Sequence, residues 1–206
     1  MNESTEVKLL NIITLVHKVT NSYLIETDNG WLMVDSGWPD TFGQLLQMLN
    51  QNNISINEVN YLVVTHFHPD HAGLVQNLKD LGTTLILHQY QVPYINKLNL
   101  LFKKNPKANF KDITLNNHNV MTESESREFL HSIGIEGEII STPGHSDDSI
   151  SLILDHCCAF VGDLPAYADI EAYNDIVIED SWDVIKKLQV KTIYPGHGDP
   201  YELPVS

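Results

Sequence analysis

The chain has few cysteines, few basic residues and no long apolar run, and each shortage excludes a class of protein. Its 206 residues include two cysteines, Cys157 and Cys158. Neighbours in sequence rarely reach the geometry of an unstrained disulfide, so the pair does not form the framework of a disulfide-rich secreted domain. Apolar stretches on both sides of the pair favour two small buried side chains over metal ligands.

Basic residues are outnumbered by acidic ones. The chain has 12 Lys and Arg against 27 Asp and Glu, which gives a formal net charge of -15 at pH 7. Such a charge repels polyphosphate backbones at long range unless a basic patch or a bound metal reverses the field locally. We therefore expect a small-molecule substrate and no nucleic acid. The sequence leaves the oligomeric state open.

No run of apolar residues approaches the length that spans a membrane. The first residues also lack the basic start and apolar stretch of a signal peptide. We expect a cytoplasmic protein that does not bind a membrane. The length fits one domain over residues 1–206 better than two small ones, and no repeat, low-complexity tract or linker divides it.

Alternating apolar patterns predict a mixed α/β protein. The predicted strands are residues 9–16, 22–26, 31–34, 61–64, 84–87, 138–141, 149–154, 157–161 and 192–194. The predicted helices are residues 41–51, 71–81, 89–101 and 182–188. Several polar motifs follow directly after strands, where loops can hold side chains over a rigid sheet.

One segment, residues 97–111, is locally basic. Its lysines are Lys97, Lys103, Lys104, Lys107 and Lys111. Pro106 interrupts any helix there. The segment is either a solvated connector or a lid or rim that attracts an anionic substrate to the site.

The strongest chemical signal follows the predicted strand at residues 61–64. Residues 65–71 read Thr-His-Phe-His-Pro-Asp-His. The candidate ligands in this run are His66, His68, Asp70 and His71. Imidazole nitrogens and carboxylate oxygens suit zinc or a similar divalent ion. Side chains so close in sequence diverge, so the remaining ligands must come from other parts of the chain.

Three later turns each supply one potential ligand. His145 ends a Thr-Pro-Gly-His turn, Asp163 follows Val-Gly, and His197 lies in Tyr-Pro-Gly-His-Gly. Each turn follows a predicted strand and contains glycine, which lets the backbone approach an ion closely. Each residue alone would be an ordinary loop residue, but together with the first motif they form a set.

These motifs, in this order, resemble the metallo-β-lactamase superfamily, and the resemblance runs from about Asn21 to Gly198. It implies a four-layer αββα sandwich with the metals in a cleft at one edge of two packed sheets. The ligands that it implies are His66, His68 and His145 for one metal, Asp70, His71 and His197 for the other, and Asp163 as the bridge. Asp35 matches an early Asp-x-Gly turn of the family and looks structural.

The resemblance indicates a hydrolase with two divalent ions, expected to be Zn²⁺, with iron or manganese as alternatives. Two such ions about 4 Å apart can lower the pKa of a shared water to roughly 7. The resulting metal-bound hydroxide would attack a carbonyl ester, thioester or lactone. Asp70 would be the catalytic residue that orients it and moves a proton. The bridging Asp163 is more similar to the glyoxalase II and lactonase branches than to true β-lactamases.

Three other functions stay open at this point. An iron-dependent persulfide dioxygenase would use the first metal site alone, a phosphodiesterase would use the same fold, and a metal-binding protein would have no activity. Two further residues have two interpretations each. Tyr167 either reaches a substrate carbonyl or packs, and His88 is either functional or an ordinary residue at the end of a strand.

Overall fold

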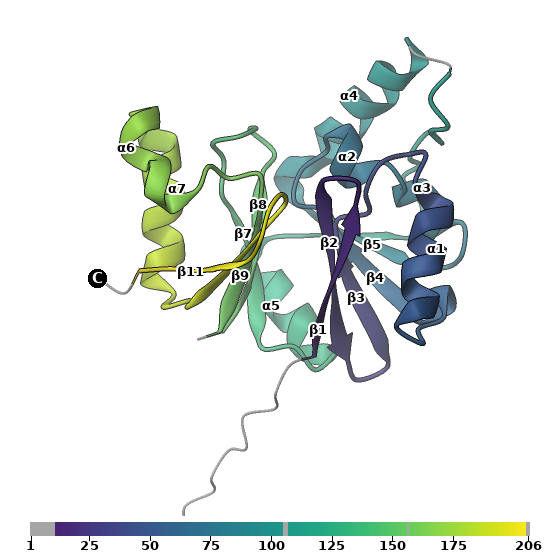
Figure 1. Ribbon diagram of the computed structural model, residues 1–206, viewed down its shortest axis with the longest axis horizontal. Helices are drawn as coiled ribbons and strands as arrows, with labels where there is room; N and C mark the ends of the chain where they lie inside the picture. The colour runs from purple at the N-terminus through teal and green to yellow at the C-terminus, as the bar shows by residue number, and fades with distance from the viewer. Residues whose placement is uncertain (1–10, 105–106, 156, 205–206) are drawn as a thin grey trace, which may run out of the picture.

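Two β-sheets pack face to face with helices on their outer sides in the computed structural model, which describes residues 11–104, 107–155 and 157–204 (Figure 1). The first sheet has the order β1-β2-β3-β4-β5-β6. Its strands are β1 (Ile12–His17), β2 (Thr20–Thr27), β3 (Gly30–Val34), β4 (Val59–Val63), β5 (Thr84–His88) and β6 (His118–Met121). The first three strands are antiparallel, and β3 to β6 are parallel.

The second sheet has the order β11-β10-β9-β8-β7. Its strands are β7 (Gly137–Ser141), β8 (Ile150–Leu154), β9 (Cys158–Gly162), β10 (Thr192–Pro195) and β11 (Tyr201–Glu202). Strands β9 and β10 are parallel, and the other pairs are antiparallel. The carboxyl ends of β9 and β10 therefore lie at the same edge of this sheet.

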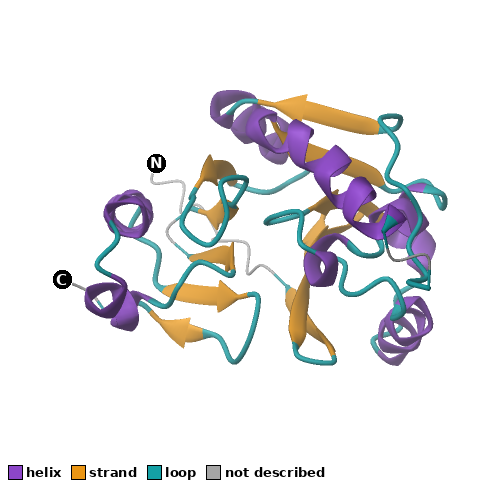
Figure 2. Cartoon of the chain, turned by 90° about the horizontal axis from the view of Figure 1, so that it is seen from above, coloured by secondary structure: helices purple, strands orange, loops and turns teal. Residues whose placement is uncertain are grey.

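The helices cover the outer face of each sheet and one end of the space between the sheets (Figures 1 and 2). They are α1 (Phe42–Gln51), α2 (Pro69–Ala72), α3 (Val75–Lys79), α4 (Val92–Lys103), α5 (Glu123–Ser132), α6 (Ile170–Tyr173) and α7 (Ile176–Lys187). Short 3-10 turns occupy Ile56–Glu58, Gln89–Gln91 and Tyr167–Asp169. Among the described residues, no helix is both long enough and apolar enough to cross a membrane.

Three apolar clusters lie between successive layers and confirm the predicted αββα sandwich. One cluster joins the first sheet to α1, α3 and α4. The second lies between the sheets, where Tyr23 of β2 contacts Phe160 of β9 with ring centroids 5.1 Å apart. The third packs the second sheet against α7 through the buried Trp182. Removal of this apolar surface from water is the main force that holds the layers together.

Several element boundaries differ from the sequence predictions. The predicted helix at residues 71–81 is two helices, α2 and α3, because Gly73 donates its N–H to the carbonyl of Gly37 and Leu74 donates to the hydroxyl of Ser36. These bonds replace the helical ladder. Strands β6 and β11 and helices α5 and α6 were not predicted, and α7 begins at Ile176, well before residue 182.

Other predictions have a partial outcome. The first strand begins at Ile12, and residues 9 and 10 of the prediction lie outside the described residues, as does Pro106. The prediction of two buried cysteines is wrong for Cys157, which is exposed in the turn between β8 and β9, while Cys158 is buried in β9. Every residue of β9 is buried, but Cys157 precedes the strand and lies in the exposed turn.

Candidate metal centre

All the predicted ligands come together as two neighbouring groups at the edge where β4, β7, β9 and β10 end. The first group is His66, His68 and His145, and the second is Asp70, His71, Asp163 and His197. Within each group the potential ligand atoms all lie within 4.8 Å of one another. The carboxyl ends of β4 in the first sheet and of β7, β9 and β10 in the second sheet bring these loops together, although the first and last ligands are far apart in sequence.

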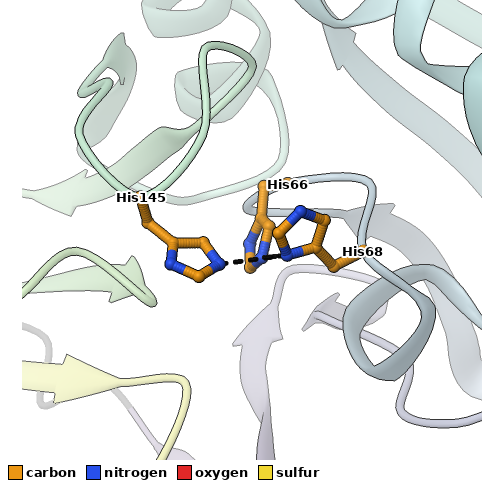
Figure 3. Close-up of side chains that lie close together, drawn as sticks. All are labelled: His66, His68 and His145. Carbon is orange, nitrogen blue, oxygen red and sulfur yellow. Dashed lines mark hydrogen bonds between the residues drawn. The ribbon is translucent and has the colours of Figure 1, made fainter.

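The first group consists of three imidazole rings that face one another from two loops (Figure 3). His68 Nδ1 lies 3.0 Å from His66 Nε2 and 3.0 Å from His145 Nε2. Nitrogens that share a tetrahedral zinc ion at about 2.0–2.1 Å are about 3.3 Å apart. The ring nitrogens are therefore spaced as ligands of one cation are.

The second group is built around the carboxylate of Asp163. Its Oδ1 lies 3.2 Å from His71 Nε2 and 3.3 Å from His197 Nε2. Its Oδ2 points to the first group, at 3.5 Å from His145 Nε2 and 3.9 Å from His66 Nε2. Asp163 thus lies between the two groups with one oxygen toward each.

The buried Asp35 holds His71 from behind. Its Oδ2 lies 2.8 Å from His71 Nδ1, and the same carboxylate accepts hydrogen bonds from the N–H and hydroxyl of Thr65. When the ring binds a metal ion, we expect its single proton on Nδ1, in a hydrogen bond to Asp35, which leaves Nε2 available on the side of Asp163. A carboxylate in this position fixes the orientation of a ligating imidazole and raises its basicity.

The turn between β1 and β2 supports the other two ligands of the second group. Thr20 donates its hydroxyl to Asp70 Oδ2 at 3.2 Å, and His197 Nδ1 lies 2.7 Å from the carbonyl oxygen of Val19. Nothing in the sequence indicated either contact, because a threonine hydroxyl and a backbone carbonyl at a hairpin turn carry no motif. Asp70 Oδ2 in turn lies 3.3 Å from His197 Nε2 and 3.5 Å from His71 Nε2.

The loop that carries the first motif is fixed by two buried residues that sequence reasoning also missed. Asp148 accepts a hydrogen bond from the backbone N–H of Phe67 at 2.7 Å. The side-chain amide of Gln91 donates to the carbonyl of Val64 at 2.8 Å and to that of Asp148 at 3.2 Å. These bonds tie the histidine loop to the loop of His145.

The residues fit a pair of divalent cations. His71 Nε2 and Asp163 Oδ1 are buried and lie 3.2 Å apart, but their geometry is not that of a hydrogen bond, and neither atom has another hydrogen-bond partner among the described residues. Buried polar atoms without partners are rare and call for an explanation such as an ion. A methyl group at Gly196 would collide with Asp163 Oδ1 and the ring of His71, so only glycine fits beneath this carboxylate.

The surroundings shift the pKa values of these groups in opposite directions. Burial and the neighbouring imidazoles hold the pKa of His66 well below its ordinary value, so the ring stays neutral. Burial also lowers the pKa of His71, but the carboxylates of Asp35 and Asp163 outweigh it and raise the value to about 10. Burial raises the pKa of Asp163, whereas His71 and the other histidines lower it by more. Without a metal, a protonated His71 compensates the charge of the carboxylates.

Two other predicted candidates lie outside the ligand groups. The hydroxyl of Tyr167 accepts a hydrogen bond from Lys186 at 2.9 Å and its ring packs on Trp182, which supports the packing interpretation. His88 is buried at the end of β5 and belongs to neither ligand group.

The profile of the metallo-beta-lactamase superfamily matches residues 16–197. A protein of Methanocaldococcus jannaschii described as "Probable metallo-hydrolase MJ0888" is 26% identical over 196 residues, which cover 87% of this chain and 88% of that protein. The "Beta-lactamase-like protein 2 homolog" of Caenorhabditis elegans is 27% identical over 184 residues, 87% of this chain. The chain spans only 56% of the length of this relative.

Solved structures show the same fold. The metallo-beta-lactamase family protein TTHA1429 from Thermus thermophilus superposes with a TM-score of 0.69 at 19% identity and covers 94% of this chain and 74% of that one. TTHA1623, solved in a di-iron-bound form, has a TM-score of 0.68 at 22% identity, and the match covers 95% of this chain and 96% of that one. The sequence profile, the fold and the convergence of the ligands agree: the chain belongs to the metallo-β-lactamase superfamily.

Proposed function

We propose that this protein is a hydrolase with two metal ions that cleaves a carbonyl ester, thioester or lactone. The observation that carries the proposal is the position of Asp163, whose two carboxylate oxygens face two complete ligand groups. Two relatives described as probable metallo-hydrolases support hydrolysis: the archaeal protein MJ0888 and YflN of Bacillus subtilis, which is 25% identical.

His66, His68 and His145 would hold one ion, Asp70, His71 and His197 the other, and Asp163 would bind both. Two divalent ions would supply an acidified water as nucleophile and would polarise the scissile carbonyl. Asp70 would orient that water and move a proton to the leaving group, a role that its half-buried position and the hydrogen bond from Thr20 to its Oδ2 support.

Zinc is the proposed metal because imidazole and carboxylate ligands suit it. The same ligands also accept iron or manganese, and the di-iron form of TTHA1623 makes iron the first alternative to test. A dioxygenase with one iron would need only the first group and Asp163. The second group is equally complete, with Asp35 and Thr20 holding its ligands, which favours a dinuclear hydrolase.

The proposed substrate is a small molecule. Two hollows border the ligand groups, with volumes of about 450 and 500 Å³, within the range of small-molecule sites. Net acidity makes a nucleic acid an unfavourable partner.

The test is metal analysis of protein purified without added metal, combined with a hydrolysis panel of thioester, lactone and phosphodiester substrates. About two zinc ions per chain with turnover of the carbonyl compounds supports the proposal. One iron per chain with oxygen consumption and no hydrolysis would replace it with the dioxygenase. Turnover of the phosphodiester alone would replace it with the phosphodiesterase.

A further inference from the structure

A hollow of about 500 Å³ opens beside the first ligand group, on the side of α4. His68 and His145 form part of its wall, so it leads directly to the proposed metal site. The other hollow, of about 450 Å³, contains Asp163 and His197, and His145 lines both. A substrate whose reacting carbonyl lies at the ligand groups can therefore extend its two halves in two directions.

The hollow beside α4 has an apolar wall suited to a hydrocarbon chain. Phe67 and Leu98 are almost completely buried in its floor, and Leu101 is 51% exposed at its edge. Pro69 adds a rigid apolar surface next to His68. Apolar surface around a few polar groups is typical of a small-molecule binding site.

Lys97 is the single lysine or arginine among the residues that line these two hollows. Its ammonium lies 3.7 Å from the ring centroid of Tyr94, and it has no ion pair with any described residue. Two other lysines of the basic segment are already paired, Lys103 with Asp112 at 3.5 Å and Lys111 with Asp80 at 2.7 Å. In a chain with a net charge of -15, this unpaired ammonium is a positive charge that lies apart from the proposed metal ions and can attract a second anionic group of a substrate.

The loop of His145 adds two aspartates to the lining of the hollow. Asp147 follows the loop of His145 and accepts a hydrogen bond from the Tyr94 hydroxyl at 3.4 Å. Asp148 is buried, and its carboxylate already accepts a hydrogen bond from the backbone N–H of Phe67. An anion in this hollow is thus attracted by Lys97 and repelled by Asp147, which favours a position in direct contact with the Lys97 ammonium.

We propose that the hollow beside α4 binds the acyl group of a substrate that carries a second acidic group, with the hydrocarbon chain on the apolar wall and the free carboxylate paired with Lys97. This inference rests on the proposed hydrolysis for the identity of the reacting group. Lys97 determines specificity and takes no part in bond cleavage.

The kinetic test compares half-thioesters of dicarboxylic acids, from succinyl to suberyl, with acyl thioesters of the same chain length and the same thiol. For the preferred length, Lys97→Met raises the ratio of the two KM values, diacid over monoacid, by roughly fivefold, the range of an exposed ion pair. Lys97→Glu raises it further, and Asp147→Asn lowers it. Lys103→Met, a loss of the same charge from the same helix outside the hollow, leaves the ratio unchanged.

A binding experiment separates this inference from the proposed hydrolysis. Calorimetry on the metal-loaded protein measures the affinity for glutarate and suberate against pentanoate and octanoate, which have the same chain lengths and one carboxylate. Tighter binding of a diacid that Lys97→Met abolishes supports the site even if no thioester is hydrolysed. Equal binding of diacids and monoacids, or an equal effect of Lys97→Met on both, would overturn the inference even if hydrolysis is confirmed.

Discussion

The first ligand group draws three imidazoles from two loops, whereas the second combines two imidazoles and two carboxylates from three segments of the chain. In the second group, hydrogen bonds hold the ligands from behind: His71 contacts Asp35, Asp70 contacts Thr20, and His197 contacts the carbonyl of Val19. These hydrogen bonds orient the three side chains independently of any ion.

The first group has much less support. His66 Nδ1 lies 3.2 Å from the hydroxyl of Thr65. The outward ring nitrogens of His68 and His145 make no hydrogen bond to any residue in the described ranges. An ion in the first site must therefore fix these two rings itself, whereas the second site is arranged in advance. This difference predicts that variants affect the two sites unequally.

The largest effect is expected for Asp163→Ala, because this carboxylate faces both groups. Both sites lose a ligand, so metal content should fall below one ion per chain. Hydrolysis should fall by well over the 10–100-fold that is typical when a residue behind a ligand is lost. Asp180→Ala, which removes an exposed carboxylate on α7, is the matched control and should leave metal content and hydrolysis unchanged. Two bound ions in Asp163→Ala would disprove the shared position of this residue.

The next effect separates the two groups. His145→Ala should remove the ion of the first site and leave the second ion bound, because the second group stays complete and supported. Loss of one charge-stabilising group commonly lowers kcat by about 10²–10³, and metal analysis with kinetics measures both changes. A variant with full metal content and full activity would show that His145 is not a ligand.

A smaller effect is expected when the hydrogen bond behind His71 is altered. Asp35→Asn keeps the shape of the side chain but removes the charge that orients His71. The affinity of the second site should fall about 10–100-fold with less change at the first site. Competition with a chromophoric chelator measures the two affinities. Asp40→Asn, at the exposed pair with Lys18, serves as the control, and equal weakening of both sites by Asp35→Asn would contradict the comparison.

The smallest predicted effect is the release of one proton from His71 when a metal ion binds. The pKa of His71 is raised to about 10, so the ring is protonated at pH 8 in the metal-free protein, and an ion must displace that proton. Because the folded protein holds this proton more tightly than the unfolded chain does, protonation of His71 stabilises the metal-free fold. The stabilisation is complete below pH 6.5, the ordinary pKa of the ring, and is lost as the pH rises through about 10. Calorimetry of metal binding in two buffers with different ionisation enthalpies should show about one proton released at the second site. Release of none at pH 8 would contradict the protonated state.

The candidate ligands, which the structure brings together, could be singled out from the sequence because their chemistry lies in short motifs at strand ends. The supports could not be predicted in the same way. Val19 contributes only a carbonyl oxygen, and it meets His197 across 178 positions of sequence. Asp148 lies next to another aspartate, and only the folded loop shows which of the two accepts from Phe67. Contacts of this kind exist only after the sheets have formed.

Prediction of the fold from the sequence fails in the same way, where an element depends on residues that are distant in the chain. Strand β6 has one buried residue, Met121, and its apolar pattern is too weak to indicate a strand without the parallel partner β5. In contrast, α5 had a usable signal, because Thr122 and Glu125 form a capping box at its start. The split of the predicted helix at residues 71–81 depends on hydrogen bonds to the turn at Ser36 and Gly37, which no local pattern reveals.

If Asp163 bridges two ions, anomalous diffraction at the zinc edge from crystals of the metal-loaded protein will locate both of them. We expect two peaks about 3.5–4 Å apart, one among His66, His68 and His145 and one among Asp70, His71 and His197, with the carboxylate of Asp163 between them. A single peak among the three histidines, with the second group empty at saturating metal, would contradict it.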